Sequence, residues 1–155
     1  MYNPVLEYNF AYPNFDANGI TEYIYGYEQG GVRGNGTRKS ITLIHQSGAS
    51  FLDYTDPEAP VILVDGIYAM FAGVQMSTLM AILYRSVMSV KLSLGDIIIS
   101  GISPLLGVGI GSPIVNLSLA PIPLLAGDIL NVSVAQGSHT RLSFIMGEGY
   151  LTKLS

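Results

Sequence analysis

The sequence contains no cysteine and no tryptophan, and it is poor in charge. Only 12% of its 155 residues are charged, whereas soluble domains average about 25%. The absence of cysteine excludes disulfides, thiolate metal sites and cysteine nucleophiles. A lone soluble domain normally covers itself with charged side chains. Two interpretations therefore follow: the chain lies in a membrane, or other subunits cover much of its surface.

The few charges that are present exclude an electrostatic nucleic-acid site. Lys and Arg number 7 against 11 Asp and Glu, which gives a net charge of −4. The only basic cluster is Arg33, Arg38 and Lys39, and a nucleic-acid groove needs a much denser basic surface. The N-terminus shows no basic segment followed by an apolar run, so we expect no secretory signal.

Tyrosine is concentrated at the start of the chain. Pro4 and Pro13 disfavour a helix before them, so residues 1–20 are predicted to form an extended arm ahead of a single domain over 21–155. The arm carries three candidate subunit contacts: Tyr2, Tyr8 and Tyr12. Tyrosine suits such contacts because it combines a large apolar area with a polar tip. Packing of these rings on the domain's own core is the alternative.

Three more tyrosines alternate in the next segment: Tyr23, Tyr25 and Tyr27. Alternation is the period of a strand that carries its rings on one face, which predicts a strand over 21–28. With Asn35 and the acidic loop at 53–58, these rings are also candidate contacts for a carbohydrate, such as a host glycan. A carbohydrate-binding module is therefore an alternative function.

Short β-forming runs with turn signals between them fill the rest of the chain. The expected strands are 40–45, 49–54, 61–64, 129–134, 141–146 and a short last one. The expected loops are 29–37, 56–60, 136–139 and 147–149, and a turn is expected at Asp65-Gly66. Residues 74–92 fit both a helical and a strand period. For them we expect a short helix or bend around 77–83 and then a strand over 85–94. Strands at this spacing predict an all-β sandwich or barrel.

Two similar corners stand out in the second half. Each consists of a short apolar segment, a Gly-Asp pair and a following strand that contains β-branched residues. The pairs are Gly95-Asp96 and Gly127-Asp128. Glycine supplies a positive φ and aspartate bonds nearby amides, so both pairs are predicted structural turns.

The second corner, Leu124-Leu-Ala-Gly-Asp-Ile-Leu-Asn-Val132, followed by a hairpin and a last apolar strand, resembles the closing strands of jelly-roll domains. Such domains occur in trimeric knobs, in tumour-necrosis-factor-like heads and in small phage virion proteins. The resemblance covers about residues 85–155. It implies a jelly-roll-like antiparallel β-sandwich and a capsid, cement or fibre-type subunit of a virion. Its implied partners are further copies, with a trimer favoured, and other virion proteins, and it transfers no catalytic residue.

Two long stretches carry no charge, one between Asp65 and Arg85 and one between Asp96 and Asp128. The second holds too many prolines and glycines for a helix. The first leaves a membrane span near 66–84 as a further alternative. Burial between subunits explains both stretches at once. The apolar loop of the second stretch supplies four candidate interface residues: Leu105, Leu106, Val108 and Ile110.

No pattern of catalytic or ligating residues accompanies these features. His45 and His139 lie far apart without a metal-binding spacing, and no Gly-x-Ser-x-Gly elbow occurs. The acidic residues near the 53–65 segment show neither a calcium nor a glycosidase spacing. We therefore expect a non-enzymatic structural protein without metal or cofactor.

Overall fold

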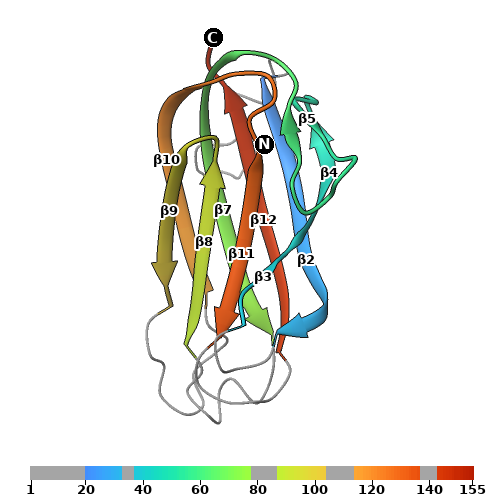
Figure 1. Ribbon diagram of the computed structural model, residues 1–155, viewed down its shortest axis with the longest axis vertical. Coiled ribbons are helices and arrows are strands. Elements are labelled where there is room, and N and C mark those ends of the chain that lie inside the picture. Colours follow the sequence, from blue (N-terminus) through green and yellow to red (C-terminus); the bar gives the residue numbers. More distant parts are fainter. Residues whose placement is uncertain (1–19, 33–36, 78–86, 104–113, 137–142) are drawn as a thin grey trace, which may run out of the picture.

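The computed structural model describes residues 20–32, 37–77, 87–103, 114–136 and 143–155. All regular elements of these residues are strands (Figure 1). In chain order they are β2 (Thr21–Val32), β3 (Lys39–Ser40), β4 (Thr42–Gly48), β5 (Leu52–Asp53), β6 (Val61–Ile62), β7 (Gly66–Ser77), β8 (Met88–Leu94), β9 (Ile97–Ile102), β10 (Ile114–Leu124), β11 (Leu130–Gln136) and β12 (Ser143–Lys153). The predicted all-β class is confirmed.

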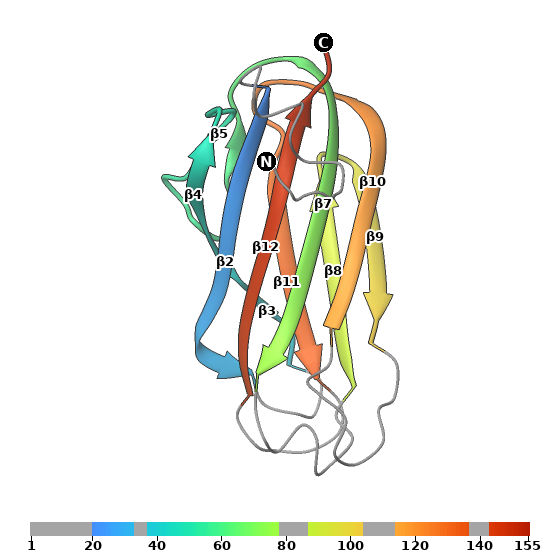
Figure 2. The ribbon, with the colours of Figure 1, turned by 180° about the vertical axis from the view of Figure 1, so that it is seen from behind.

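Two antiparallel sheets form a sandwich. The larger has five strands in the order β10-β7-β12-β2-β4, and the smaller has four in the order β3-β11-β8-β9. Figure 1 views the four-stranded sheet from the front, and Figure 2 views the five-stranded sheet from the opposite side. A two-stranded ribbon of β5 and β6 lies beside them. The expected jelly-roll-like sandwich is confirmed.

The core between the sheets follows the period of two that strands require. On β8, Met88, Val90, Leu92 and Leu94 are at most 1% exposed, and the residues between them face outward. On β10, Val115, Leu117 and Leu119 alternate with exposed neighbours in the same way. This pattern confirms the strand expected before the first Gly-Asp corner. Of the bend expected around 77–83, Ser77 belongs to β7 and the remainder lies outside the described residues.

The alternative of a helical membrane span over 66–84 is wrong for the part that can be compared. Residues 66–77 form β7, which pairs with β10 on one side and β12 on the other. Its inward positions are buried, but outward residues such as Ile67 and Phe71 are apolar too. Apolar residues on both faces hid the strand period in the sequence. Within the described ranges, no helix has the length and apolar character to cross a membrane.

The turn expected at 147–149 is also wrong, because β12 runs without interruption through these residues. Gly147 and Gly149 pair with β2 and with β7. A Cβ at Gly149 would lie 2.5 Å from the carbonyl oxygen of Phe71, and one at Gly147 would lie 2.8 Å from that of Gly73. These glycines permit a close approach of neighbouring backbones, which is their second common use besides turns.

Several strand boundaries differ from those expected. β2 continues to Val32, four residues beyond 28, and Gln136 ends β11 where a turn was expected. Residues 40–45 divide between β3 and β4, which belong to different sheets. Of 49–54 only β5 is a strand, and of 61–64 only β6. Gly66 begins β7 directly after Asp65, where a turn had been expected. Residues 1–19 and the loop at 105–110 lie outside the described residues, so the arm and loop contacts stay predictions.

Candidate functional site on the outer face of the five-stranded sheet

Five aromatic side chains gather on the outer face of the three central strands of the larger sheet. Because β2 turns Ile24 and Gly26 toward the core, its three alternating tyrosines face outward. Tyr150 on β12 pairs with Tyr23 on β2 and with Phe71 on β7. We call the set the aromatic face: Tyr23, Tyr25, Tyr27, Phe71 and Tyr150.

The rings of the aromatic face pack in two groups, one of Phe71, Tyr150 and Tyr23 and one of Tyr25 and Tyr27. The ring centroids of Tyr23 and Tyr150 are 6.1 Å apart, and those of Phe71 and Tyr150 are stacked at 5.5 Å. Tyr25 and Tyr27 are 6.0 Å apart. These separations lie within the range in which aromatic pairs attract, so the rings hold one another in position.

An open hollow of about 290 Å³ lies within the aromatic face. Gly73 occupies an outward position of β7 between Phe71 and Gln75 and lines the hollow, and the Asn116 side chain of β10 lies against it. Polar groups join the rings around the hollow: Gln46, Gln75 and Glu148. A second hollow of about 280 Å³ shares Phe71 and Tyr150 with the first. The stacked pair therefore divides two neighbouring depressions.

The structure brings together three of the four candidate carbohydrate contacts, Tyr23, Tyr25 and Tyr27, whereas Asn35 lies outside the described residues. Phe71 and Tyr150 were missed by sequence reasoning. Phe71 lies in the uncharged stretch that also fitted a membrane span, and Tyr150 follows the two glycines interpreted as a turn. A continuous strand through those glycines would have aligned Tyr150 with the tyrosines of β2.

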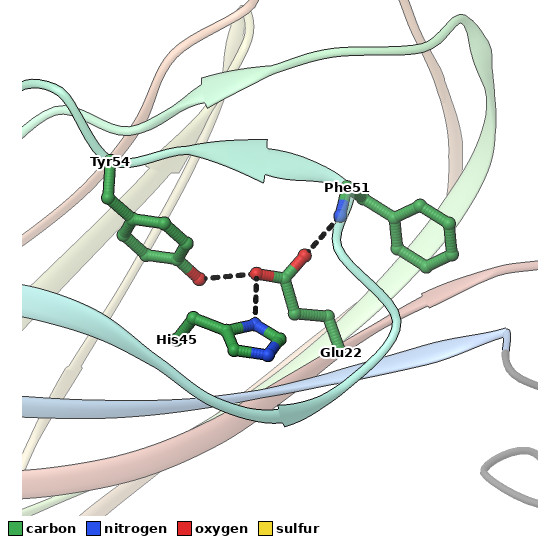
Figure 3. A network of polar contacts seen from close by, with 4 residues as sticks. All are labelled: Glu22, His45, Phe51 and Tyr54. Atoms are coloured by element: carbon green, nitrogen blue, oxygen red, sulfur yellow. Dashed lines mark hydrogen bonds and ion pairs between the residues drawn. The ribbon is translucent and has the colours of Figure 1, made fainter.

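A buried carboxylate, Glu22, lies at the beginning of β2 (Figure 3). Its side chain is 0% exposed. Oε1 accepts a hydrogen bond from the backbone N–H of Phe51 at 2.5 Å, and Oε2 accepts one from the Tyr54 hydroxyl at 2.6 Å. Nδ1 of His45 lies 3.2 Å from Oε2. Burial, and next the hydrogen bond to Glu22, raise the pKa of Tyr54 far above its ordinary value.

The Glu22 cluster, made of Glu22, His45, Phe51 and Tyr54, joins strands of the larger sheet to a neighbouring segment. A β-bulge leaves Gln46 unpaired between His45, which lies opposite Ile24, and Ser47, which lies opposite Tyr23. Both carboxylate oxygens are engaged, and none of the four cluster residues lines either hollow. The cluster thus ties the edge strand β4 and the 51–54 segment to β2. Nothing in the sequence around Glu22 indicates this role.

The acidic residues after β5 do not converge on a common point. Asp53 accepts hydrogen bonds from the Thr55 hydroxyl and N–H, which lower the pKa of Asp53. Asp56 accepts from the N–H of Glu58, and Asp65 from that of Ala126. The oxygens of Asp53 and Asp56 therefore stabilise local turns, whereas that of Asp65 joins the segment before β7 to the corner after β10. Across the described ranges, no group of three or more histidine and acidic residues is arranged to hold a metal ion.

The two Gly-Asp pairs lie at corners of the sandwich. Gly95 has a φ of 61° in the β8–β9 turn, and Gly127 has a φ of 100° between β10 and β11. Oδ2 of Asp128 accepts a hydrogen bond from the N–H of Leu125 at 2.9 Å. Glycine is favoured at such φ values because a side chain would be strained there.

Comparison with known proteins supports the fold alone. No protein-family model matches the chain, and no curated protein sequence matches it. Among solved structures, the phage PRD1 vertex protein P5 superimposes with a TM-score of 0.59 at 12% identity, covering 88% of this chain and 99% of that one. The globular domain of zebrafish complement 1qA protein superimposes with a TM-score of 0.58 at 12% identity, covering 86% and 98%. The chain thus has a jelly-roll-like fold similar to that of a phage vertex protein and of a complement domain.

Proposed function

We propose that this chain is a structural subunit of a viral particle, assembled as a homotrimer through the aromatic face and without catalytic activity. A capsid, cement or fibre-type subunit would need self-association and no reactive residues. The fold shared with a phage vertex protein agrees with this role. The aromatic face carries the proposal, because it is a broad apolar surface at the centre of a sheet.

The chemistry of the aromatic face suits a protein interface. Tyrosine and phenylalanine are enriched where subunits meet, and charged residues are depleted at the centre of such contacts. Of the described residues around the larger hollow, Glu148 is the only charged one. The rings span three adjacent strands, so one broad partner surface would cover them more completely than a peptide could.

A further copy of the chain is the partner that we propose. The chain has only 18 charged residues in 155, and shielding by sister copies explains how so few keep a β-sandwich in solution. The native species is then three times the 16.6 kDa of one chain, or a multiple of that mass. The expected neighbours in the particle are other virion proteins.

Light scattering on the Phe71→Lys variant tests the interface. Trimer formation would bring several lysines into one apolar contact, so the mass is expected to fall below that of three chains. Ser93→Lys is the matched control, since Ser93 lies outward on β8 of the other sheet. It should leave the mass unchanged. A folded Phe71→Lys protein with the wild-type mass, or a wild-type mass of one or two chains at micromolar concentration, would contradict the proposal.

Carbohydrate binding is a second candidate, favoured by the polar groups beside the rings. Sugars stack on aromatic faces while amides and carboxylates bond their hydroxyls, and Gln46, Gln75 and Glu148 adjoin the larger hollow. A sister copy on the aromatic face would exclude such a ligand. Glycan-array binding that Tyr25→Ala abolishes, by a wild-type protein of monomer mass, would favour the second candidate over the first.

A further inference from the structure

Among the described residues, the edge of the four-stranded sheet formed by β9 is unpaired and apolar. Within the described residues, β9 pairs with β8 and has no hydrogen-bonded neighbour on its other side. The segment Ile97-Ile-Ile-Ser-Gly-Ile102 holds no charge. Ile98 and Ile102 are 63% and 69% exposed. They stand beside Ser93 and Ser89 of β8, so they form an isoleucine strip on an otherwise polar face.

Two other edges of the sandwich are protected, whereas no described residue protects β9. Free edges are commonly blunted by proline, bulges, charges or a covering segment. β10, the neighbouring edge of the five-stranded sheet, has Pro121 and Pro123 and a shift in register between Leu119 and Ile122. The edge strand β4 is covered where the N–H of Leu43 donates to the carbonyl oxygen of Pro57. In the part of the chain that the structure describes, β9 has none of these devices.

We propose that β9 pairs antiparallel with β9 of a second copy, joining two four-stranded sheets into one. A neighbouring strand is the one partner that satisfies a row of backbone N–H and C=O groups and also covers the isoleucine strip. The pairing is related by a two-fold axis, so the same strand meets itself.

The composition of β9 favours self-pairing over a foreign strand. Antiparallel self-pairing centred on Ser100 places Ile98 opposite Ile102 and sets no charge against another. A strand selected for a different partner would usually carry side chains complementary to that partner's charges.

This contact is separate from the aromatic face, because β9 belongs to the other sheet. It does not require the proposed trimer. If both contacts form, the three-fold contact makes a closed unit and the two-fold contact links such units, which is a route to an extended assembly. If only β9 pairs, the protein is a dimer.

A single introduced cysteine tests the pairing, because the chain has none of its own. Ser100 is exposed near the centre of β9. Directly opposed residues of antiparallel strands have Cα atoms about 4.5–5.5 Å apart, within disulfide range. Mild oxidation of Ser100→Cys is therefore expected to give a covalent dimer on a denaturing gel. Ser93→Cys on β8 is the control, since two such residues would be separated by three strand spacings, at least about 14 Å.

A charge at the edge supplies the second measurement. Ile98→Lys in the Ser100→Cys chain is expected to abolish the covalent dimer. The control is Ser93→Lys in the same chain, because Ser93 is the cross-strand neighbour of Ile98, and it should leave the dimer intact. In the Phe71→Lys chain, which lacks the trimer contact, light scattering should give two copies, and adding Ile98→Lys should give one. A failure of Ser100→Cys to cross-link, or a dimer that Ile98→Lys leaves unchanged, would overturn the β9 pairing whatever the outcome for the trimer.

Discussion

The five-stranded sheet turns aromatic rings outward, whereas the four-stranded sheet turns outward small polar side chains and one isoleucine strip. On the smaller sheet, Nη1 of Arg38 donates to the carbonyl oxygen of Ser133, and Nη2 donates to the Ser89 hydroxyl at 2.7 Å. The inner faces of the two sheets are alike, since both sheets bury alternating aliphatic residues. Packing in the core therefore explains the fold, and the outer faces distinguish what each sheet can bind.

The sheets also differ in how their strands are held. The five-stranded sheet includes the buried carboxylate of Glu22 and close backbone contacts at Gly147 and Gly149. In the four-stranded sheet, β8 and β11 bury mainly aliphatic side chains, and the buried Ser133 accepts from Arg38. Substitutions in the larger sheet should thus act through polar and backbone contacts, and those in the smaller sheet through apolar volume.

Replacing Glu22 by glutamine should weaken the polar contacts of the five-stranded sheet and give the largest loss of stability. The amide keeps one acceptor oxygen for the N–H of Phe51, and its NH₂ group replaces the oxygen that accepts from Tyr54, so both bonds lose the negative charge of their acceptor. Hydrogen bonds to a charged group are worth about 1.5–3 kcal/mol and are about twice as strong as neutral ones, so we expect the free energy of unfolding to fall by about 2–3 kcal/mol. Urea denaturation at neutral pH measures this. The exposed Glu148→Gln is the control, with a change within about 0.5 kcal/mol; equal effects of the two would refute the anchor role of Glu22.

A pair of glycine substitutions compares the sheets directly. In Gly149→Ala the new methyl group would meet the backbone oxygen of Phe71 at 2.5 Å. In Gly101→Ala on β9 it would meet the side-chain methyl groups of Leu117 and Val115 at 2.9 Å. Backbone cannot move aside as methyl groups can, so we expect Gly149→Ala to destabilise by about 1–3 kcal/mol and Gly101→Ala by less. Thermal unfolding of both variants provides the measurement. A larger loss of stability in Gly101→Ala than in Gly149→Ala would contradict the expected difference between the two sheets.

The sequence predicted those parts of the fold in which one face is apolar and the other polar. β8 is such a case, because Ser89, Lys91 and Ser93 separate its buried residues. β7 and β12 were misinterpreted for one common reason. Both lie between two other strands and carry apolar side chains or glycine on both faces, so neither the period of two nor the meaning of glycine could be recognised locally.

The candidate site was predictable to the same extent. Alternation alone indicated the tyrosines of β2, but their alignment with Phe71 and Tyr150 depends on pairing between strands that are distant in the sequence. Glu22 and His45 are 23 residues apart, and they are brought together by a β-bulge that the local sequence does not predict. Long-range register, rather than residue type, was the missing information.

Replacing Tyr54 by phenylalanine is expected to change the free energy of unfolding least. The change depends on pH, however, and this dependence identifies the hydroxyl as its cause. At neutral pH Glu22 loses one of its three donors, at a cost of about 1.5 kcal/mol for a bond to a charged group. Folding raises the pKa of Tyr54 above its ordinary value of 10.0, through burial and then the bond to Glu22. Above about pH 10 the unfolded chain therefore releases this proton while the folded chain keeps it, and the wild type loses stability by up to about 1.4 kcal/mol per pH unit through this group.

The Tyr54→Phe variant lacks that hydroxyl, so the difference in unfolding free energy between wild type and variant should shrink as the pH rises from about 9 to about 11. Urea denaturation at several pH values measures the difference. Phe71→Leu on the outer face of β7 is the control, because it removes no ionisable group, and its difference from wild type should stay nearly constant over the same range. A Tyr54→Phe difference that is constant or grows with pH would mean that the hydroxyl is not held by the carboxylate of Glu22, and that the five-stranded sheet is not anchored by a buried charge.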